Sequence, residues 1–121
     1  MHLVLSPQGF KLNVEDQVFT KPAKMPEFPG GPEALRKFLE INIRYPREAQ
    51  IGKIQGKVFV IFIVAEDGTV TNPKIVKGVH ELLDDEAMRL VKIMPAFIPG
   101  QNESGAPIKV SFTLPITFKL Q

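Results

Sequence analysis

The 121-residue sequence, with 44% hydrophobic and 23% charged residues, has the composition of one ordinary globular domain. A net charge of +2 without a basic run gives no reason to expect nucleic-acid binding, and the lack of cysteine excludes disulfides and thiolate chemistry. No apolar run reaches transmembrane length, and the first ten residues lack the features of a signal peptide. The sequence is therefore expected to be either cytosolic or a soluble piece of a longer chain.

A proline-rich stretch follows a weakly patterned start, in which residues 3–5 and 14–19 could each form a short strand. Residues 22–32 contain four prolines and two glycines, which excludes helix and central strand and predicts an extended connector. The apolar residues Met25 and Phe28 are predicted to pin this connector to the body of the protein.

A first helix is predicted to begin at Pro32, because proline is tolerated at the first helical position and Gly31 can serve as the cap. Its largely apolar stripe consists of Leu35, Phe38, Leu39 and Asn42. A break is expected at Tyr45, since a residue before proline is disfavoured in helices. One more short turn is expected over residues 47–51.

Two strands are predicted next. Residues 58–65 are continuously apolar, which is typical of a central strand with both faces covered. The Asp67-Gly68 pair predicts a tight turn into a return strand over residues 70–77. Because Pro73 cannot donate to a ladder, this return strand is expected to be an edge strand or to contain a bulge.

A second helix is predicted to begin with Asp84 as its N-cap, and the next two acidic residues complement the helix dipole. We prefer this interpretation of the acidic triplet to a metal site. Leu83 before the cap is expected to pack on Met88 as a hydrophobic staple, and Pro95 ends the helix. The predicted inner face consists of Ala87, Leu90, Val91 and Met94.

In the last strand, residues 107–120, every even position is apolar and nearly every odd position is polar, which predicts a half-buried strand. Its inner face consists of Ile108, Val110, Phe112, Leu114, Ile116, Phe118 and Leu120. Pro115 is expected on an edge strand or at a bulge, and an edge strand would be a surface where another extended chain could pair. The alternative is that Pro115 only protects the edge from aggregation.

The predicted fold class is α+β, with a three-stranded antiparallel or mixed sheet and two helices packed on one face. The strand over residues 58–65 is central, between 70–77 and 107–120, and a right-handed crossover makes the two outer strands parallel to each other. Phe59, Ile61 and Ile63 then lie on the face away from the helices. They are expected to be covered by residues 3–19 or by a second copy of the chain.

No set of residues indicates an enzyme. The two histidines, His2 and His80, are not accompanied by a ligand set or an acid–base partner, so we expect no cofactor, no metal and no catalytic residue.

The chain resembles the C-terminal domain of TonB-type energy transducers, in the form common in Bacteroidetes-like bacteria. The resemblance covers about four-fifths of the chain, and one departure is Phe97, where the family usually has Trp. It implies an N-terminal extension or linker over residues 1–24 and a domain over 25–121. The segments that carry it are MPEFPGG (25–31), RYPREAQ (44–50), IQGKVFVIFIVAEDGTVTNPKIVKG (54–78), LDDEAMRLVKIMP (83–95), FIPGQ (97–101) and PIKVSFTLPITFKL (107–120).

The resemblance implies a periplasmic domain that a membrane helix outside this chain anchors to the inner membrane, where an ExbB/ExbD-like motor acts on it. Such a domain adds the extended N-terminal segment of an outer-membrane TonB-dependent transporter as a strand to its sheet. Carried over by position, the partner-binding residues are Asn42, Arg44, Tyr45, Val110, Ser111, Phe112, Thr113, Leu114, Ile116 and Thr117.

Two alternatives remain open at this point. The same kind of domain resembles one fused to membrane sensors of the metallopeptidase type, where it would act as a sensing or protein-interaction module. A homodimer formed by edge pairing or by strand exchange would occlude the predicted binding edge.

Overall fold

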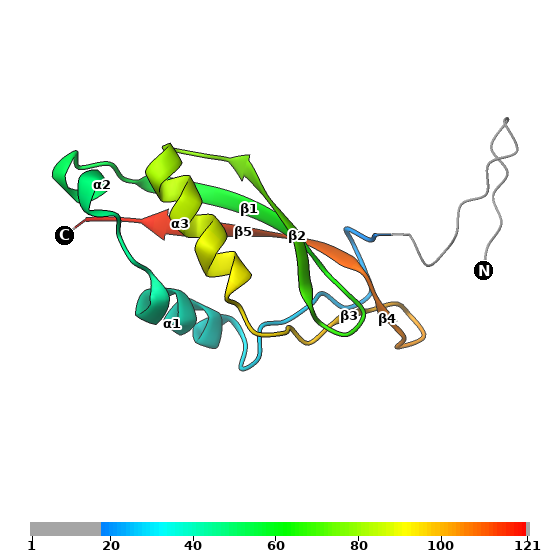
Figure 1. Cartoon of the computed structure of the whole chain (residues 1–121). Helices are drawn as coiled ribbons and strands as arrows, with labels where there is room; N and C mark the ends of the chain where they lie inside the picture. Colours follow the sequence, from blue (N-terminus) through cyan, green and yellow to red (C-terminus); the bar gives the residue numbers. More distant parts are fainter. Residues whose placement is uncertain (1–17, 121) are drawn as a thin grey trace, which may run out of the picture.

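The computed structural model describes residues 18–120 and confirms the α+β class. Figure 1 shows the helices and the sheet, with α3 crossing in front of the strands and α1 lying toward the β5 side. The elements are α1 (Pro32–Asn42), α2 (Arg47–Ile51), β1 (Gly56–Val64), β2 (Val70–Lys77), α3 (Glu81–Lys92), β3 (Gly100–Gln101), β4 (Pro107–Ile108) and β5 (Val110–Phe118).

The main sheet has the strand order β2-β1-β5, as predicted, and β1 is antiparallel to both neighbours. The two outer strands are therefore parallel to each other. The even positions of β1 from Val58 to Val64 are fully buried under the helices, whereas the odd positions are half-buried. The continuous apolar run of β1 thus reflects a strand that has a ladder on each side.

Strand β2 shows both of the alternatives that Pro73 predicted, a position at the edge of the sheet and irregular pairing. It pairs only with β1 within the described residues, and its register shifts twice, between Phe59 and Val60 and between Ile61 and Ile63 of β1. Asn72, directly before the proline, has a φ of 51°, a left-handed conformation that Asn tolerates better than most residues. These irregularities make β2 a poor template for a further strand.

Helix α3 begins four residues earlier than predicted, so the assignment of Asp84 as its N-cap was wrong. His80 is the N-cap, and its Nδ1 accepts a hydrogen bond from the amide of Leu82 at 3.1 Å. Asp84 lies in the first turn and accepts from the amide of Val79 at 3.0 Å. Leu83 is fully buried inside the helix, so it is a core residue rather than the staple predicted to pack on Met88.

The buried face of α3 confirms most of the predicted inner face, because Ala87, Leu90 and Val91 are fully buried and Met94 packs against the core. Helix α1 starts after Gly31, as predicted, but contributes no fully buried residue. It is held to the body partly by Phe38, whose ring centroid lies 5.5 Å from that of Phe28. Helix α1 is therefore a partly open layer at the β5 side.

The predicted strand over residues 107–120 is divided. Pro107–Ile108 forms β4, which pairs with β3 in a separate two-stranded sheet, and only Val110–Phe118 joins β1. The division arises because the loop before β5 folds back, so that Gly100 lies opposite Ile108. The buried alternation is as predicted within β5 from Leu114 to Phe118.

The connector runs along the loop that follows α3. Lys24 pairs with Gln101 and Glu27 with Ile98, while Phe28 is buried, as predicted. The prediction for Met25 was wrong, because 45% of its surface is exposed.

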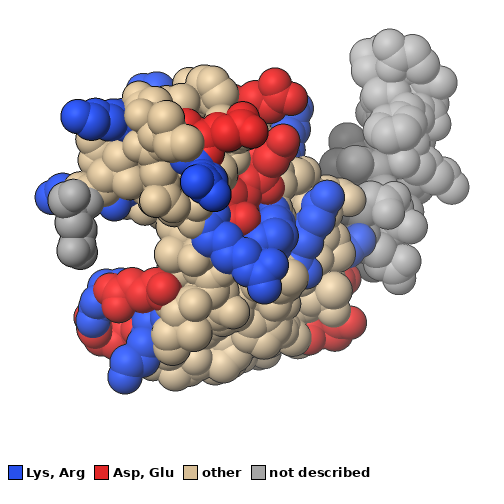
Figure 2. All heavy atoms as spheres, turned by 60° about the vertical axis from the view of Figure 1, so that its left-hand side comes forward, with Lys and Arg blue, Asp and Glu red and all other residues tan. Residues whose placement is uncertain are grey.

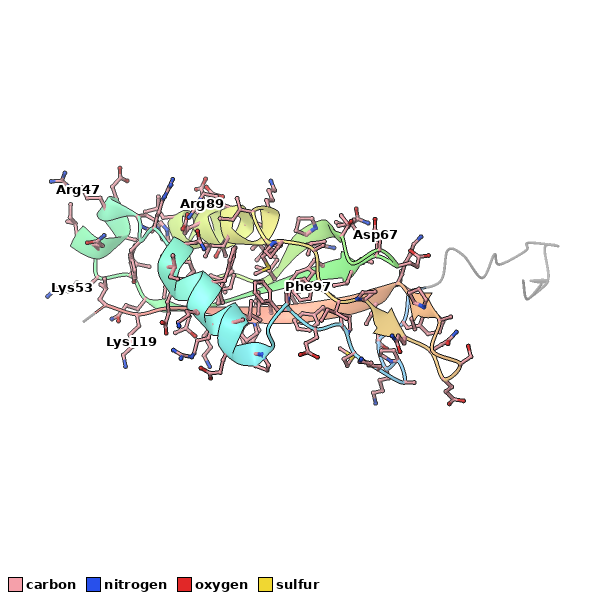
Figure 3. All side chains as sticks on the ribbon, turned by 90° about the horizontal axis from the view of Figure 1, so that it is seen from below. Arg47, Lys53, Asp67, Arg89, Phe97 and Lys119 are labelled. Carbon is pink, nitrogen blue, oxygen red and sulfur yellow. The ribbon has the colours of Figure 1, made fainter. Side chains whose placement is uncertain are left out.

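Phe97, the residue that departs from the Trp usual in the family, is 3% exposed. It packs edge-on against the rings of Phe28, Phe62 and Phe112 at centroid distances of 5.5 to 5.7 Å, near the middle of the molecule in Figure 3. The aromatic side chain thus joins the connector, the central strand and the edge strand.

The face with Phe59, Ile61 and Ile63 is half-buried. Most of the segment predicted to cover it, residues 3–19, lies outside the described residues, and so do the short strand at 3–5 and the start of the one at 14–19. The end of that segment, Phe19, pairs with the edge of β5.

Candidate functional site

The outer edge of β5 is the feature around which the candidate site is built. Phe19 lies parallel to Val110, its amide donating to the carbonyl of Lys109 at 2.9 Å and its carbonyl accepting from the amide of Ser111 at 2.8 Å. Beyond this bridge, no other strand within residues 18–120 pairs with the outer edge. Among these described residues, nothing pairs with this edge from Thr113 onward.

The bridge to Phe19 also shows which backbone groups face outward. In a strand, the N–H and C=O of one residue point to the same side, and the side alternates along the chain. Because Ser111 donates outward, Thr113, Pro115 and Thr117 also present their backbone outward. Pro115, opposite Phe59, therefore leaves the ladder to β1 complete. Its missing N–H removes a donor only from the outer edge of β5.

A groove with a volume of about 640 Å³ lies between α1 and the second half of β5. Figure 2 shows it as a hollow, with charged side chains along the α1 side. On that side it is lined by Pro32, Leu35, Arg36, Leu39 and Glu40, and on the strand side by Leu114, Pro115, Ile116, Thr117 and Lys119. The groove is thus directly adjacent to the open part of the edge.

Helix periodicity explains the lining. Leu35 and Leu39 are spaced four residues apart, so their side chains lie on one face of α1, and both line the groove together with the C-cap residue Ile43. Leu114 and Ile116 belong to the buried face of β5. The centre of the groove is therefore apolar.

The charged residues lie at the rim, where Arg36 binds Glu33 at 2.8 Å and Glu40 at 2.5 Å. The hydrogen bond and the charge of Arg36 lower the pKa of Glu33, so this carboxylate stays ionised at neutral pH. The cation nearest the apolar lining on α1 is thus already paired within its own helix.

Tyr45 lies at one end of the groove. Its hydroxyl donates to the carbonyl of Ile54, and its ring packs edge-on against Phe118 at a centroid distance of 5.8 Å. Burial raises the pKa of Tyr45, which keeps the hydroxyl protonated as a donor. These contacts fix the segment between α1 and α2 against the end of β5.

An ion pair on α3 between the buried Glu86 and the half-buried Arg89 holds the chain just before Tyr45. Glu86 accepts from Nε of Arg89 at 2.7 Å and from the backbone amide of Arg44 at 2.6 Å, and Arg89 donates to the carbonyl of Asn42 at 2.7 Å. Burial acts to raise the pKa of Glu86, but the hydrogen bonds from Arg89 and Arg44 and the charge of Arg89 lower it overall. Arg89 projects from α3 in Figure 3.

The structure brings together only part of the predicted partner-binding set. Tyr45, Leu114, Ile116 and Thr117 line the groove. Thr113 is exposed at the open edge, and the outward amide of Ser111 is bonded to Phe19.

The other predicted residues have structural contacts. Val110 is fully buried, and the ring of Phe112 stacks on Phe62. The side-chain amide of Asn42 donates to the carbonyl of Phe38, and the amide of Arg44 donates to Glu86. The sequence interpretation missed the α1 residues of the groove, although the spacing of Leu35, Leu39 and Ile43 was a signal for them.

Within residues 18–120 there is no group of three or more His, Asp or Glu side chains placed to bind a metal ion. In the same part of the chain, no helix is long and apolar enough to cross a bilayer.

The fold and the edge define a small α+β domain whose last strand is open to pairing along its outer half. Residues 41–120 match the family described as the Gram-negative bacterial TonB protein C-terminal. The chain belongs to this family.

Among its relatives, Protein TonB of Haemophilus influenzae is 35% identical over 86 residues, which are 67% of this chain and 31% of the relative. Protein TonB of Helicobacter pylori is 34% identical over 79 residues, which are 64% of this chain and 26% of the relative. The chain thus spans about a third or less of the length of these curated relatives.

Two NMR solution structures of the Helicobacter pylori TonB C-terminal domain have the same fold. One is 30% identical with a TM-score of 0.54 and covers 72% of this chain and 78% of that chain. The other is 28% identical with a TM-score of 0.54 and covers 74% of this chain and 92% of that chain.

Proposed function

We propose that this domain is the partner-binding part of a TonB-type energy transducer and that it binds an extended segment by strand addition at the outer edge of β5. The observation that carries the proposal is the isolated bridge to Phe19, because its two backbone hydrogen bonds already pair in parallel with this edge. The edge beyond it, from Thr113 to Thr117, is free of any strand among residues 18–120.

The wider setting of the proposal comes from the family. The partner is the N-terminal segment of an outer-membrane TonB-dependent transporter, the domain is periplasmic and anchored to the inner membrane, and an ExbB/ExbD-like motor acts on it. A backbone ladder suits this task, because it distributes load over several hydrogen bonds and depends little on side-chain sequence. The sensor-type fusion is a weaker candidate, since the curated relatives described above are TonB proteins.

The test uses a pair of variants at Thr113, whose N–H points outward. Thr113→Pro removes that donor and leaves the ladder to β1 complete, as Pro115 already does two residues further on. Thr113→Val changes the side chain at the same exposed position but keeps the N–H. We would titrate the isotope-labelled domain with N-terminal transporter peptides and follow the amide shifts of β5.

Strand addition predicts that Thr113→Pro weakens binding several-fold, while Thr113→Val binds like the unaltered chain. Equal binding by both variants, with the fold retained, would refute pairing at this edge. Sedimentation at the same concentrations shows whether a second copy of the chain occupies the edge instead.

A further inference from the structure

We propose that the groove between α1 and β5 selects apolar side chains at alternate positions of the added strand. This inference rests on the proposed function and extends it from backbone pairing to side-chain recognition. Neighbouring strands lie about 4.8 Å apart, and successive side chains point to opposite faces of a sheet. A strand added beside Pro115 therefore projects every second side chain to the same face as Leu114 and Ile116, where the groove lies.

The lining determines which side chains fit. On the α1 side the lining residues Leu35 and Leu39 are apolar, and Arg36 is bonded to Glu33 and Glu40; on the strand side Lys119 is the charged lining residue. A charged side chain entering the groove loses water and gains no counter-ion from the middle of the lining. A branched aliphatic side chain has no comparable hydration to lose. Its burial removes apolar surface of both partners from water.

Apolar contacts in the groove matter for affinity because the backbone ladder that the open part of β5 can form with a partner is short. Phe19 pairs with Lys109 and Ser111, and Pro115 has no N–H, so Thr113 and Thr117 supply the outward amide donors of the second half of β5. Each backbone hydrogen bond formed with the partner replaces one made with water, so its net contribution is modest. Apolar contacts in the groove supply the additional affinity and restrict which segments bind.

The occupant is an extended peptide rather than a helix or a small molecule. The groove is continuous with an edge that already pairs with one extended segment at Phe19. The groove of about 640 Å³ borders the second half of β5, and Figure 2 shows it as a hollow beside α1. A strand at this position satisfies the outward backbone groups and fills the apolar groove together.

The experiment compares three seven-residue peptides with alternating patterns, in which Val, Ser or Lys alternates with Thr. Calorimetry measures their binding to the unaltered chain and to two variants of α1. Leu39→Asp introduces a carboxylate into the groove. Ile41→Asp makes the same change on the same helix at a side chain that is 74% exposed and does not line the groove.

We expect the unaltered chain to bind the Val peptide at least about tenfold more tightly than the Ser or Lys peptide. Leu39→Asp abolishes this preference and binds the Lys peptide more tightly than the unaltered chain does. Ile41→Asp keeps the affinities within about twofold. The gain for the Lys peptide is decisive, because a merely destabilised α1 would weaken all three peptides.

Leu39→Ser is the second variant if Leu39→Asp perturbs folding, and amide spectra of β1 report on the fold of each protein. Equal affinity for the Val and Ser peptides, or an unchanged preference in both Leu39 variants, would overturn the inference. If Thr113→Pro still weakens binding in that case, strand addition stands and only selection by the groove fails. If Thr113→Pro has no effect either, the proposed function fails as well.

Discussion

The carbonyl of Phe19 accepts a hydrogen bond from the amide of Ser111 at 2.8 Å, so the chain's own N-terminal segment occupies the first part of the edge proposed for the partner. The partner footprint in this state is limited to the stretch after Ser111. The domain therefore contains an internal competitor for half of its edge.

Phe19→Pro should weaken this competitor, because proline cannot donate to the carbonyl of Lys109. One hydrogen bond has a net value of about 0.5–1.5 kcal/mol, so we expect several-fold tighter peptide binding. The peptide-induced shifts should extend from Thr113 back to Lys109. Phe19→Ala, which keeps the N–H, is the matched control, and identical footprints for both variants would contradict the competition.

Glu86→Gln should destabilise the domain by roughly 1–3 kcal/mol at neutral pH, because it removes a charged acceptor for Arg89 and the amide of Arg44. The folded-state pKa of Glu86 is lowered, so its contribution is present above the unfolded pKa of about 4.3 and is lost as the pH falls through the folded pKa. Urea denaturation of both proteins between pH 7 and pH 3 measures this.

The two stability curves should therefore converge toward acid pH. Glu81→Gln, at an exposed position of the same helix, should change stability little across the whole range. A difference between Glu86→Gln and the unaltered chain that persists undiminished at pH 3 would show that the ion pair is not its source.

Gly68→Ala tests the close contact between the hairpin and the aromatic cluster. A Cβ at Gly68 would lie 1.9 Å from the carbonyl oxygen of Phe97, and the φ of 90° is itself unfavourable for alanine. At Gly105, φ is 84° but no atom lies within 4 Å of a Cβ, so Gly105→Ala isolates the backbone penalty.

We expect Gly105→Ala to cost about 1 kcal/mol and Gly68→Ala at least about 1 kcal/mol more. Each kcal/mol corresponds to a fall of about 4–8 °C in Tm for a domain of this size. Equal melting temperatures for the two variants would mean that the hairpin and Phe97 separate without cost.

Tyr45→Phe should lower stability by about 0.5–1.5 kcal/mol, because the carbonyl of Ile54 loses its donor while the ring contact with Phe118 is retained. Peptide affinity should remain within about twofold, since the apolar end of the groove is kept. Thermal denaturation and calorimetry separate these two effects, and a large loss of affinity would instead assign the hydroxyl a direct contact with the partner.

The elements that follow from local patterns could be predicted from the sequence. The apolar run of β1 indicated a strand paired on both sides, and Pro73 and Pro115 indicated the two edges. The start of α3 could not be found in this way, because His80 is not a preferred N-cap and Asp84 is.

The candidate site was predictable only in part, because the remainder depends on contacts between distant segments. The alternation in β5 indicated an edge strand, but which backbone groups face outward follows from the bridge to Phe19. The position of Glu86 near the start of a helix fitted the helix-dipole pattern and suggested no further role. Its hydrogen bond from the amide of Arg44 could not be predicted, because the two residues are 42 positions apart. An apolar stripe on α1 does not reveal that part of it borders an open groove.

If the domain acts as proposed and is pulled through its upstream chain, the bridge at Phe19 has a mechanical consequence. Within residues 18–120, this two-hydrogen-bond contact is the first backbone contact along the chain, and the next is at Lys24. We expect such a pull to break the Phe19 contact before the contact at Lys24, which would uncover Lys109 and Ser111 for the proposed partner strand. Force would then lengthen the lifetime of the complex at low loads, and optical-tweezer measurements of bond lifetime against force can detect such catch-bond behaviour.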